Sequence, residues 1–369
     1  MITAFVLGAS RGGEAHLPIY EAGGDSYDDA LEIPDVAISY AVYAEVNPND
    51  LDGVVHYYAL EALHGDELYI ELMAPALDYQ ERYAPEVILV GPGLDAPDDE
   101  NQTVLGELGV SLPAGAGMLR WTFDGAVDGF LPEGVPNSEE FEPFGQVVLW
   151  ERQSASLFLP SDGTYYVLVV GLYPVPLDGG LYVPGTEPFR YLLVTGYEES
   201  FGFVDFATIS LDWIRIRIFW GETPAVFMLP TLLTVAGGMA ATVWYLRARM
   251  PDFLKSMPTR RRVAFLAGLG AGWSMIGGGL NQLLFLLGSP FFDIASIAAL
   301  VLAFQALALF LGLIAMRLVS NLVGRPRLEG IVLPSIIFLA ALTVGAGFIV
   351  GPLLFIASST ALVVLGRTP

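Results

Sequence analysis

Four acidic side chains follow a Gly-Pro-Gly turn at 91–93 and offer the chemistry of a calcium site. They are Asp95, Asp98, Asp99 and Glu100. Ca²⁺ prefers carboxylate oxygens, and one loop can place several of them around a single ion. Neither this spacing nor that of Asn-Asp-Leu-Asp-Gly at 49–53 matches an EF-hand loop. A calcium site at these four residues is therefore one hypothesis, and the sequence favours a solvated acidic loop.

Other chemically capable residues give weaker patterns. His56, His64 and Asp66 flank one turn, whereas a structural metal site needs further ligands at a characteristic spacing. Four glutamates between 139 and 151 offer the acid–base pair of a glycosidase, but that role depends on a carboxyl separation that the sequence does not give. The chain has no cysteine, no Walker motif and no G-x-G-x-x-G dinucleotide fingerprint. We assign no catalytic residue and no cofactor besides the calcium hypothesis, and the sequence favours a non-enzymatic role.

Three amide side chains lie inside long apolar runs of the second half. Asn281 and Gln282 share one run, and Gln305 lies in the next. Such amides either line a site or form hydrogen bonds between helices, and the second role is the commoner one. The runs contain no Asp, Glu, Lys, Arg or His, which argues against a pump, a proton-coupled transporter or an intramembrane haem held by histidine.

The two halves of the chain differ in charge. Residues 1–221 carry 36 acids and 7 arginines, a net charge of 7 − 36 = −29. Residues 222–369 carry 4 acids and 10 bases, a net charge of +6. So acidic a first half repels nucleic acid, which we exclude as a partner, and attracts cations or basic proteins.

The second half is predicted to be a transmembrane helical domain at 222–369. The apolar runs 224–246, 263–287 and 294–316 each reach the ~20 residues that a crossing needs. The uncharged run that begins at 331 is too long for one crossing, and Gly351-Pro352 favours a turn within it. We therefore predict helices at 331–349 and 352–366, which makes five, or four if this last stretch is tilted or re-entrant.

The basic loops predict the orientation. One set follows the first run: Arg247, Arg249, Lys255, Arg260, Arg261 and Arg262. Another follows the third run: Arg317, Arg325 and Arg327. Positive loops remain in the cytoplasm, so the acidic half is expected outside the plasma membrane.

The first half has the pattern of a β-sandwich. Short segments of branched and aromatic residues alternate with Gly, Pro and Asp turns, which predicts an antiparallel, jelly-roll-like domain at 36–198. The predicted strands are 36–46, 54–60, 67–73, 87–90, 118–123, 146–150, 156–159, 165–170 and 191–195. Residues 1–35 are either the remnant of a signal peptide or an ordinary first strand. Residues 199–221 form an aromatic linker, for which we favour an interfacial helix with Arg215 and Arg217 reaching lipid phosphates.

Three segments resemble a known family. HYYALEALHGDELYIEL (56–72), LPSDGTYYVLVVG (159–171) and FRYLLVTGY (189–197) are similar to strands of bacterial pre-peptidase C-terminal (PPC-type) domains. The resemblance covers about 36–198 and departs from the family by acidic insertions at 95–108 and 124–145 and by the membrane helices. It implies an accessory module and supplies no catalytic residues.

Two functions fit these observations. The first is a multi-pass membrane protein that displays an extracellular module binding a protein or a glycan. The alternative is an accessory subunit of a larger membrane complex, or a transporter for an uncharged or lipidic solute.

Overall fold

The computed structural model describes residues 16–21, 23–46, 54–77, 85–121, 138–142, 147–171, 188–198, 200, 203–288, 295–324, 331–343 and 350–366. The chain divides into two compact units. Residues 1–143 and 147–200 form the first unit, and residues 144–146 and 201–369 form the second. Each unit is described by itself.

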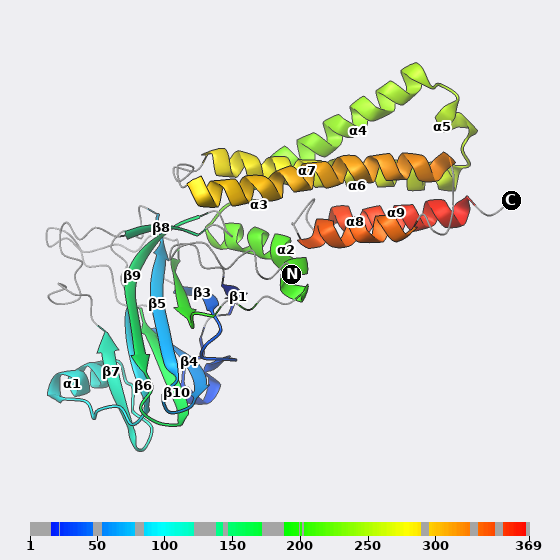
Figure 1. Ribbon diagram of the computed structural model, residues 1–369. Helices are drawn as coiled ribbons and strands as arrows, with labels where there is room; N and C mark the ends of the chain where they lie inside the picture. Colours follow the sequence, from blue (N-terminus) through cyan, green and yellow to red (C-terminus); the bar gives the residue numbers. More distant parts are fainter. Residues whose placement is uncertain are drawn as a thin grey trace, which may run out of the picture. The chain divides into compact units, whose positions relative to one another are not determined.

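The first unit contains two β-sheets (Figure 1). The six-stranded sheet has the order β1 (Leu17–Ile19), β3 (Tyr40–Val46), β11 (Phe189–Thr195), β5 (Glu67–Pro75), β9 (Val147–Phe158), β8 (Ser138–Glu142). The five-stranded sheet has the order β2 (Leu31–Ile33), β4 (Val55–Ala62), β10 (Gly163–Val170), β6 (Glu86–Pro92), β7 (Ala116–Trp121).

One apolar core lies between the two sheets. Alternate residues of β5, such as Leu68, Ile70 and Leu72, pack with Tyr191 of β11 from the same sheet. The five-stranded sheet contributes alternate residues of β4 and β10, among them Tyr58. Because side chains in a strand point to opposite faces in turn, this period-two burial gives the sandwich its buried faces. The two sheets and the core that they share agree with the predicted sandwich.

The edges of the sheets differ from the prediction of a purely antiparallel fold. Most neighbouring strands are antiparallel, but β1 pairs with β3 in parallel, and β2 pairs with β4 in parallel. Both short strands precede residue 36, so the sheets begin earlier than the predicted domain boundary. Their length of 3 residues each is too short for a periodic signal, which explains why the pattern did not reveal them.

One long strand replaces two predicted ones. The segments 146–150 and 156–159 were predicted as separate strands, and the structure corrects this to the single strand β9 of 12 residues. Gln153 and Ser154, which lie between the two predicted segments, pair with Leu72 and Glu71 of β5 in register. A register shift between Leu72 and Met73 of β5 marks a bulge in this pairing.

A second apolar layer covers the outer face of the five-stranded sheet. It involves helix α1 (Asp99–Glu107), which lies within the segment predicted as an acidic loop. Leu105 of α1 and Val110 pack on Ile88, Met118 and Leu168 of the sheet. The predicted solvated loop is therefore corrected to a short helix that has one buried side, while its acids remain at the surface.

The second unit is helical. Its elements are α2 (Phe203–Phe219), α3 (Pro224–Phe227), α4 (Leu229–Arg249), α5 (Phe253–Ser256), α6 (Thr259–Gly288), α7 (Ala295–Gly324), α8 (Val332–Thr343) and α9 (Val350–Leu365). Three of the described helices, α4, α6 and α7, are long and apolar enough to cross a membrane. Apolar helices α8 and α9 follow at the two remaining predicted positions but are shorter, about 18 Å and 24 Å at 1.5 Å per residue. The number of membrane crossings stays a prediction.

Helix α6 is the centre of the bundle because its glycines allow close approach. A Cβ atom on Gly268 would lie 2.6 Å from Val319 of α7 and 2.8 Å from the Ser358 hydroxyl of α9. A Cβ atom on Gly272 would lie 2.9 Å from the carbonyl oxygen of Gly312 of α7. Small residues that allow such close approach are typical of interfaces between membrane helices.

The predicted turn at Gly351-Pro352 falls inside a helix. Gly351 and Pro352 are the second and third residues of α9, and both are buried. Proline suits the first turn of a helix, where its missing N–H has no intrahelical acceptor. The prediction of a turn at Gly351-Pro352 is therefore wrong, since the two residues begin a helix. The connection at 344–349 lies outside the described residues.

The aromatic linker contains the expected helix, α2, but its two arginines differ. Arg217 is buried and pairs with Glu222 at 2.6 Å, and its guanidinium lies 5.8 Å from the centre of the Trp213 ring. The side chain of Arg215 is 60% exposed and lies 3.7 Å from Asp212. Of the two, Arg215 alone has the exposure that contact with a lipid phosphate requires, so the prediction is wrong for Arg217.

Candidate functional sites

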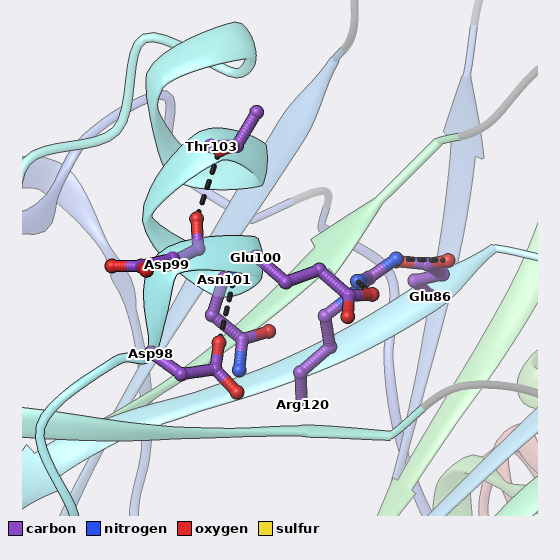
Figure 2. Close-up of polar contacts among 7 residues, drawn as sticks. All are labelled: Glu86, Asp98, Asp99, Glu100, Asn101, Thr103 and Arg120. Atoms are coloured by element: carbon purple, nitrogen blue, oxygen red, sulfur yellow. Dashed lines mark hydrogen bonds and ion pairs between the residues drawn. The ribbon is translucent and has the colours of Figure 1, made fainter.

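The acidic segment that suggested calcium is built around the start of α1 (Figure 2). Asp98 is the N-cap residue, and its Oδ1 accepts a hydrogen bond of 2.8 Å from the backbone N–H of Asn101. Asp99 and Glu100 lie in the first turn, where negative charge is favourable to the helix dipole. The Thr103 hydroxyl donates to the backbone oxygen of Asp99 at 2.8 Å. These contacts hold the helix end.

An arginine from the neighbouring strand completes this cluster. Arg120 of β7 donates from Nε and Nη2 to the two carboxylate oxygens of Glu86 of β6, at 2.8 Å and 2.9 Å. Its Nη1 lies 3.7 Å from Oε1 of Glu100. The hydrogen bond to Glu86 raises the pKa of Arg120 further, so the charge is permanent. Figure 2 shows Glu100 reaching from α1 toward this pair.

The arrangement gives two of the four calcium candidates a structural role. Asp98 caps the helix and Glu100 contacts Arg120, while the backbone oxygen of Asp95 accepts from the N–H of Met118 at 2.9 Å. In the part of the chain described here, no group of three or more His, Asp or Glu side chains lies close enough to hold a metal ion. The calcium site stays a prediction.

The histidine pair considered for a metal is separated along β4. His64 lies in the turn after the strand, where its N–H donates to Asp162 at 2.6 Å and its Nδ1 lies 2.9 Å from the Pro160 oxygen. Asp66 accepts from the N–H of Leu63 at 2.8 Å. His56 is buried at the other end of the strand. These three residues therefore do not form one site.

His56 instead belongs to a chain of hydrogen bonds between the two sheets. Its Nδ1 lies 2.6 Å from the hydroxyl of Tyr191, which lies 2.6 Å from the hydroxyl of Tyr58. The N–H of Gly23 donates to Tyr58 at 3.2 Å. An ordering consistent with all three bonds has Gly23 donating to Tyr58, Tyr58 to Tyr191, and Tyr191 to a neutral His56. Burial lowers the pKa of His56, and the charge of Asp25 opposes this only partly. The strand pattern placed His56 and Tyr58 on one face of β4 but gave no signal for Tyr191.

Two of the three amides in the apolar helices meet, as the packing interpretation predicts. Nε2 of Gln305 on α7 donates to Oε1 of Gln282 on α6 at 2.7 Å, and Asn281 is fully buried beside Gln282 in the sequence. Oε1 of Gln305 is buried and has no hydrogen-bond partner among the described residues. The two glutamines therefore form a hydrogen bond between α6 and α7, and it leaves the Gln305 Oε1 acceptor unused among the described residues.

Comparison with known proteins adds no family to this description. The chain matches no family model and no curated protein.

Proposed function

We propose that this chain is a membrane-anchored binding module without catalysis of its own. The sheet domain lies outside the plasma membrane and binds a protein with a basic surface, while the apolar helices hold it in the bilayer. The observation that carries this proposal is the sign of the exposed charge on the sheet domain.

The described arginines of the sheet domain are withdrawn from solvent. Its three described arginines are Arg120, Arg152 and Arg190, and each is at least four-fifths buried. Arg120 pairs with Glu86, and Arg190 pairs with Glu45 at 2.8 Å. The guanidinium of Arg152 lies 5.0 Å from the centre of the Trp150 ring.

Acidic residues, in contrast, are widely exposed on the same domain. Those on and around the five-stranded sheet are Asp25, Asp28, Asp29, Glu32, Glu61, Asp98, Asp99, Glu100 and Glu107. Within the described part of this domain, exposed side-chain charge is therefore negative throughout. Such a surface steers a basic partner toward it and repels an anionic one, and salt weakens the attraction.

The family resemblance supports the role of an accessory module. Its three segments become β4, β5, β10 and β11, which lie inside the two sheets rather than at their edges. Gly65, with φ at +89°, takes the left-handed conformation in the turn between β4 and β5. We infer a PPC-type domain from these features, and the outward orientation from the basic loops of the helical half.

The test is capture of the full-length protein in mild detergent, followed by mass spectrometry of bound proteins. We expect a basic partner that cross-links to the sheet domain and dissociates as the salt concentration rises. Binding to a neutral glycan with no salt dependence would replace this proposal. The orientation has its own test, since protease added to intact cells should digest residues 1–200 and leave the helices. Protection of that domain would refute the outward placement.

A second function, subunit of a larger membrane assembly, is favoured by helix α4. Only 17% of its apolar window is buried, against 56% for α6. Three long helices exceed what tethering one domain requires, and an uncovered α4 offers a surface to another membrane protein. A stable membrane partner that cross-links to α4 would select this function.

A further inference from the structure

Basic residues converge at one end of the helical bundle. Helix α4 ends at Arg249, α5 follows it, and α6 begins at Thr259, so the C-terminus of α4 and the N-terminus of α6 share this end (Figure 1). Helix α7 ends there too, because Arg261 of α6 contacts the carbonyl oxygen of Val323 near the last residue of α7. The loop that follows α4 therefore lies at the same end of the bundle as the last turn of α7.

The basic residues between the end of α4 and the start of α6 divide into two groups. Arg261 and Arg262 are partly buried and bind backbone oxygens, Arg261 that of Val323 and Arg262 that of Met257 at 3.0 Å. They stabilise helix ends and loops. The exposed cations form the second group, which we name the basic end: Arg247, Arg249, Lys255 and Arg260. The single acid between residues 229 and 288 is Asp252, which lies 4.0 Å from Lys255.

Two exposed aromatic side chains precede the basic end on α4. Trp244 and Tyr245 of α4 are 71% and 53% exposed and lie just before Arg247. Exposed Trp and Tyr side chains prefer the level of lipid headgroups. At 1.5 Å per residue, the arginines lie about 3 to 8 Å further along the helix axis, at the level of the phosphates.

From this arrangement we propose that the basic end binds the headgroups of anionic phospholipids in the leaflet that it faces. Three observations support lipid as the occupant. The surface is continuous with the exposed apolar side of α4, its charge is complementary to phosphate, and an aromatic pair sets its depth. The proposal is independent of what the sheet domain binds, so either can fail without the other.

The experiment measures binding of fluorescent phosphatidylglycerol and phosphatidylcholine to the full-length protein in neutral detergent. The test variant combines Arg247→Gln, Arg249→Gln and Arg260→Gln. The matched control carries Lys at the same three positions and so keeps the charge. A base near an anionic surface contributes about fivefold in affinity, so the Gln variant should lose roughly 100-fold for phosphatidylglycerol. The Lys variant should lose far less, and phosphatidylcholine binding should not change.

Three results would overturn the proposal. One is equal affinity of the wild type for the two lipids. The second is unchanged phosphatidylglycerol binding in the Gln variant. The third is displacement of the lipid by inorganic phosphate in molar excess, which would assign the surface to a free anion. A thermal melt of each variant guards against unfolding, and Arg261→Gln provides the reverse control, with a lowered melting temperature and retained lipid selectivity.

Discussion

Replacing Gly272 with alanine tests the packing of α6 against α7 most directly. The added methyl group would lie 2.9 Å from the Gly312 carbonyl oxygen and would overlap Met316. The contact is reciprocal, because a Cβ atom on Gly312 would lie 2.7 Å from the Gly272 carbonyl oxygen. Backbone atoms cannot move aside as a flexible side chain can, so the helices must separate. Overpacking of this kind costs about 1–3 kcal/mol in the free energy of unfolding.

Gly237 of α4 supplies the matched control, because a Cβ atom there meets nothing within 4 Å. Gly237→Ala should leave stability unchanged or raise it by up to about 1 kcal/mol, the helix propensity of alanine over glycine. Both variants are compared with the wild type by equilibrium unfolding in mixed micelles, followed by far-UV circular dichroism. Equal stability of the two variants would refute the close approach of α6 and α7 at Gly272.

Three further predictions concern the cap, the buried histidine and the amide pair. Asp98→Ala should lower the free energy of unfolding by about 1 kcal/mol and speed hydrogen exchange in α1. Removal of a surface acid that caps no helix should lower it little. His56 has a lowered pKa in the folded state, so the unfolded state binds more protons below about pH 6.5 and stability falls as pH decreases through that value. Thermal melts across this range should show a shallower decline for His56→Gln, and an identical decline would exclude His56 as a contributor. Gln282→Leu should destabilise the bundle by up to about 1.7 kcal/mol, because it leaves buried Gln305 without its acceptor. Adding Gln305→Leu should recover stability, and a double-mutant cycle measures the coupling between the two residues.

Sequence analysis predicted best the elements that follow long apolar or alternating segments. Strands β4, β5, β6, β10 and β11 follow segments in which apolar residues alternate or run without interruption, and α4, α6 and α7 follow uncharged runs longer than a bilayer core. In both cases many consecutive residues must suit the same environment, either the core between the sheets or an apolar helix. Their elements were therefore recognised from hydrophobicity alone.

Features that depend on a few contacts were missed or wrongly predicted. The acids of α1 masked a helix whose buried side consists of few residues, among them Leu105. Arg215 and Arg217 look equivalent in the sequence, and their different roles follow from which face of α2 each occupies. The bond between His56 and Tyr191 joins residues 135 positions apart, which no local pattern encodes. Tertiary contacts decide such positions.

The chain has a single lysine, and it lies in the basic end, so amine labelling can be used to locate that end of the bundle. Lys255 on α5 is the sole lysine of the chain, and its side chain is 78% exposed. Amine-directed reagents thus have a single internal target, placed far from every acid of the sheet domain in the sequence. Labelling with a reagent that cannot pass a bilayer would read out which compartment that tip of the bundle occupies, and bound phospholipid would shield it.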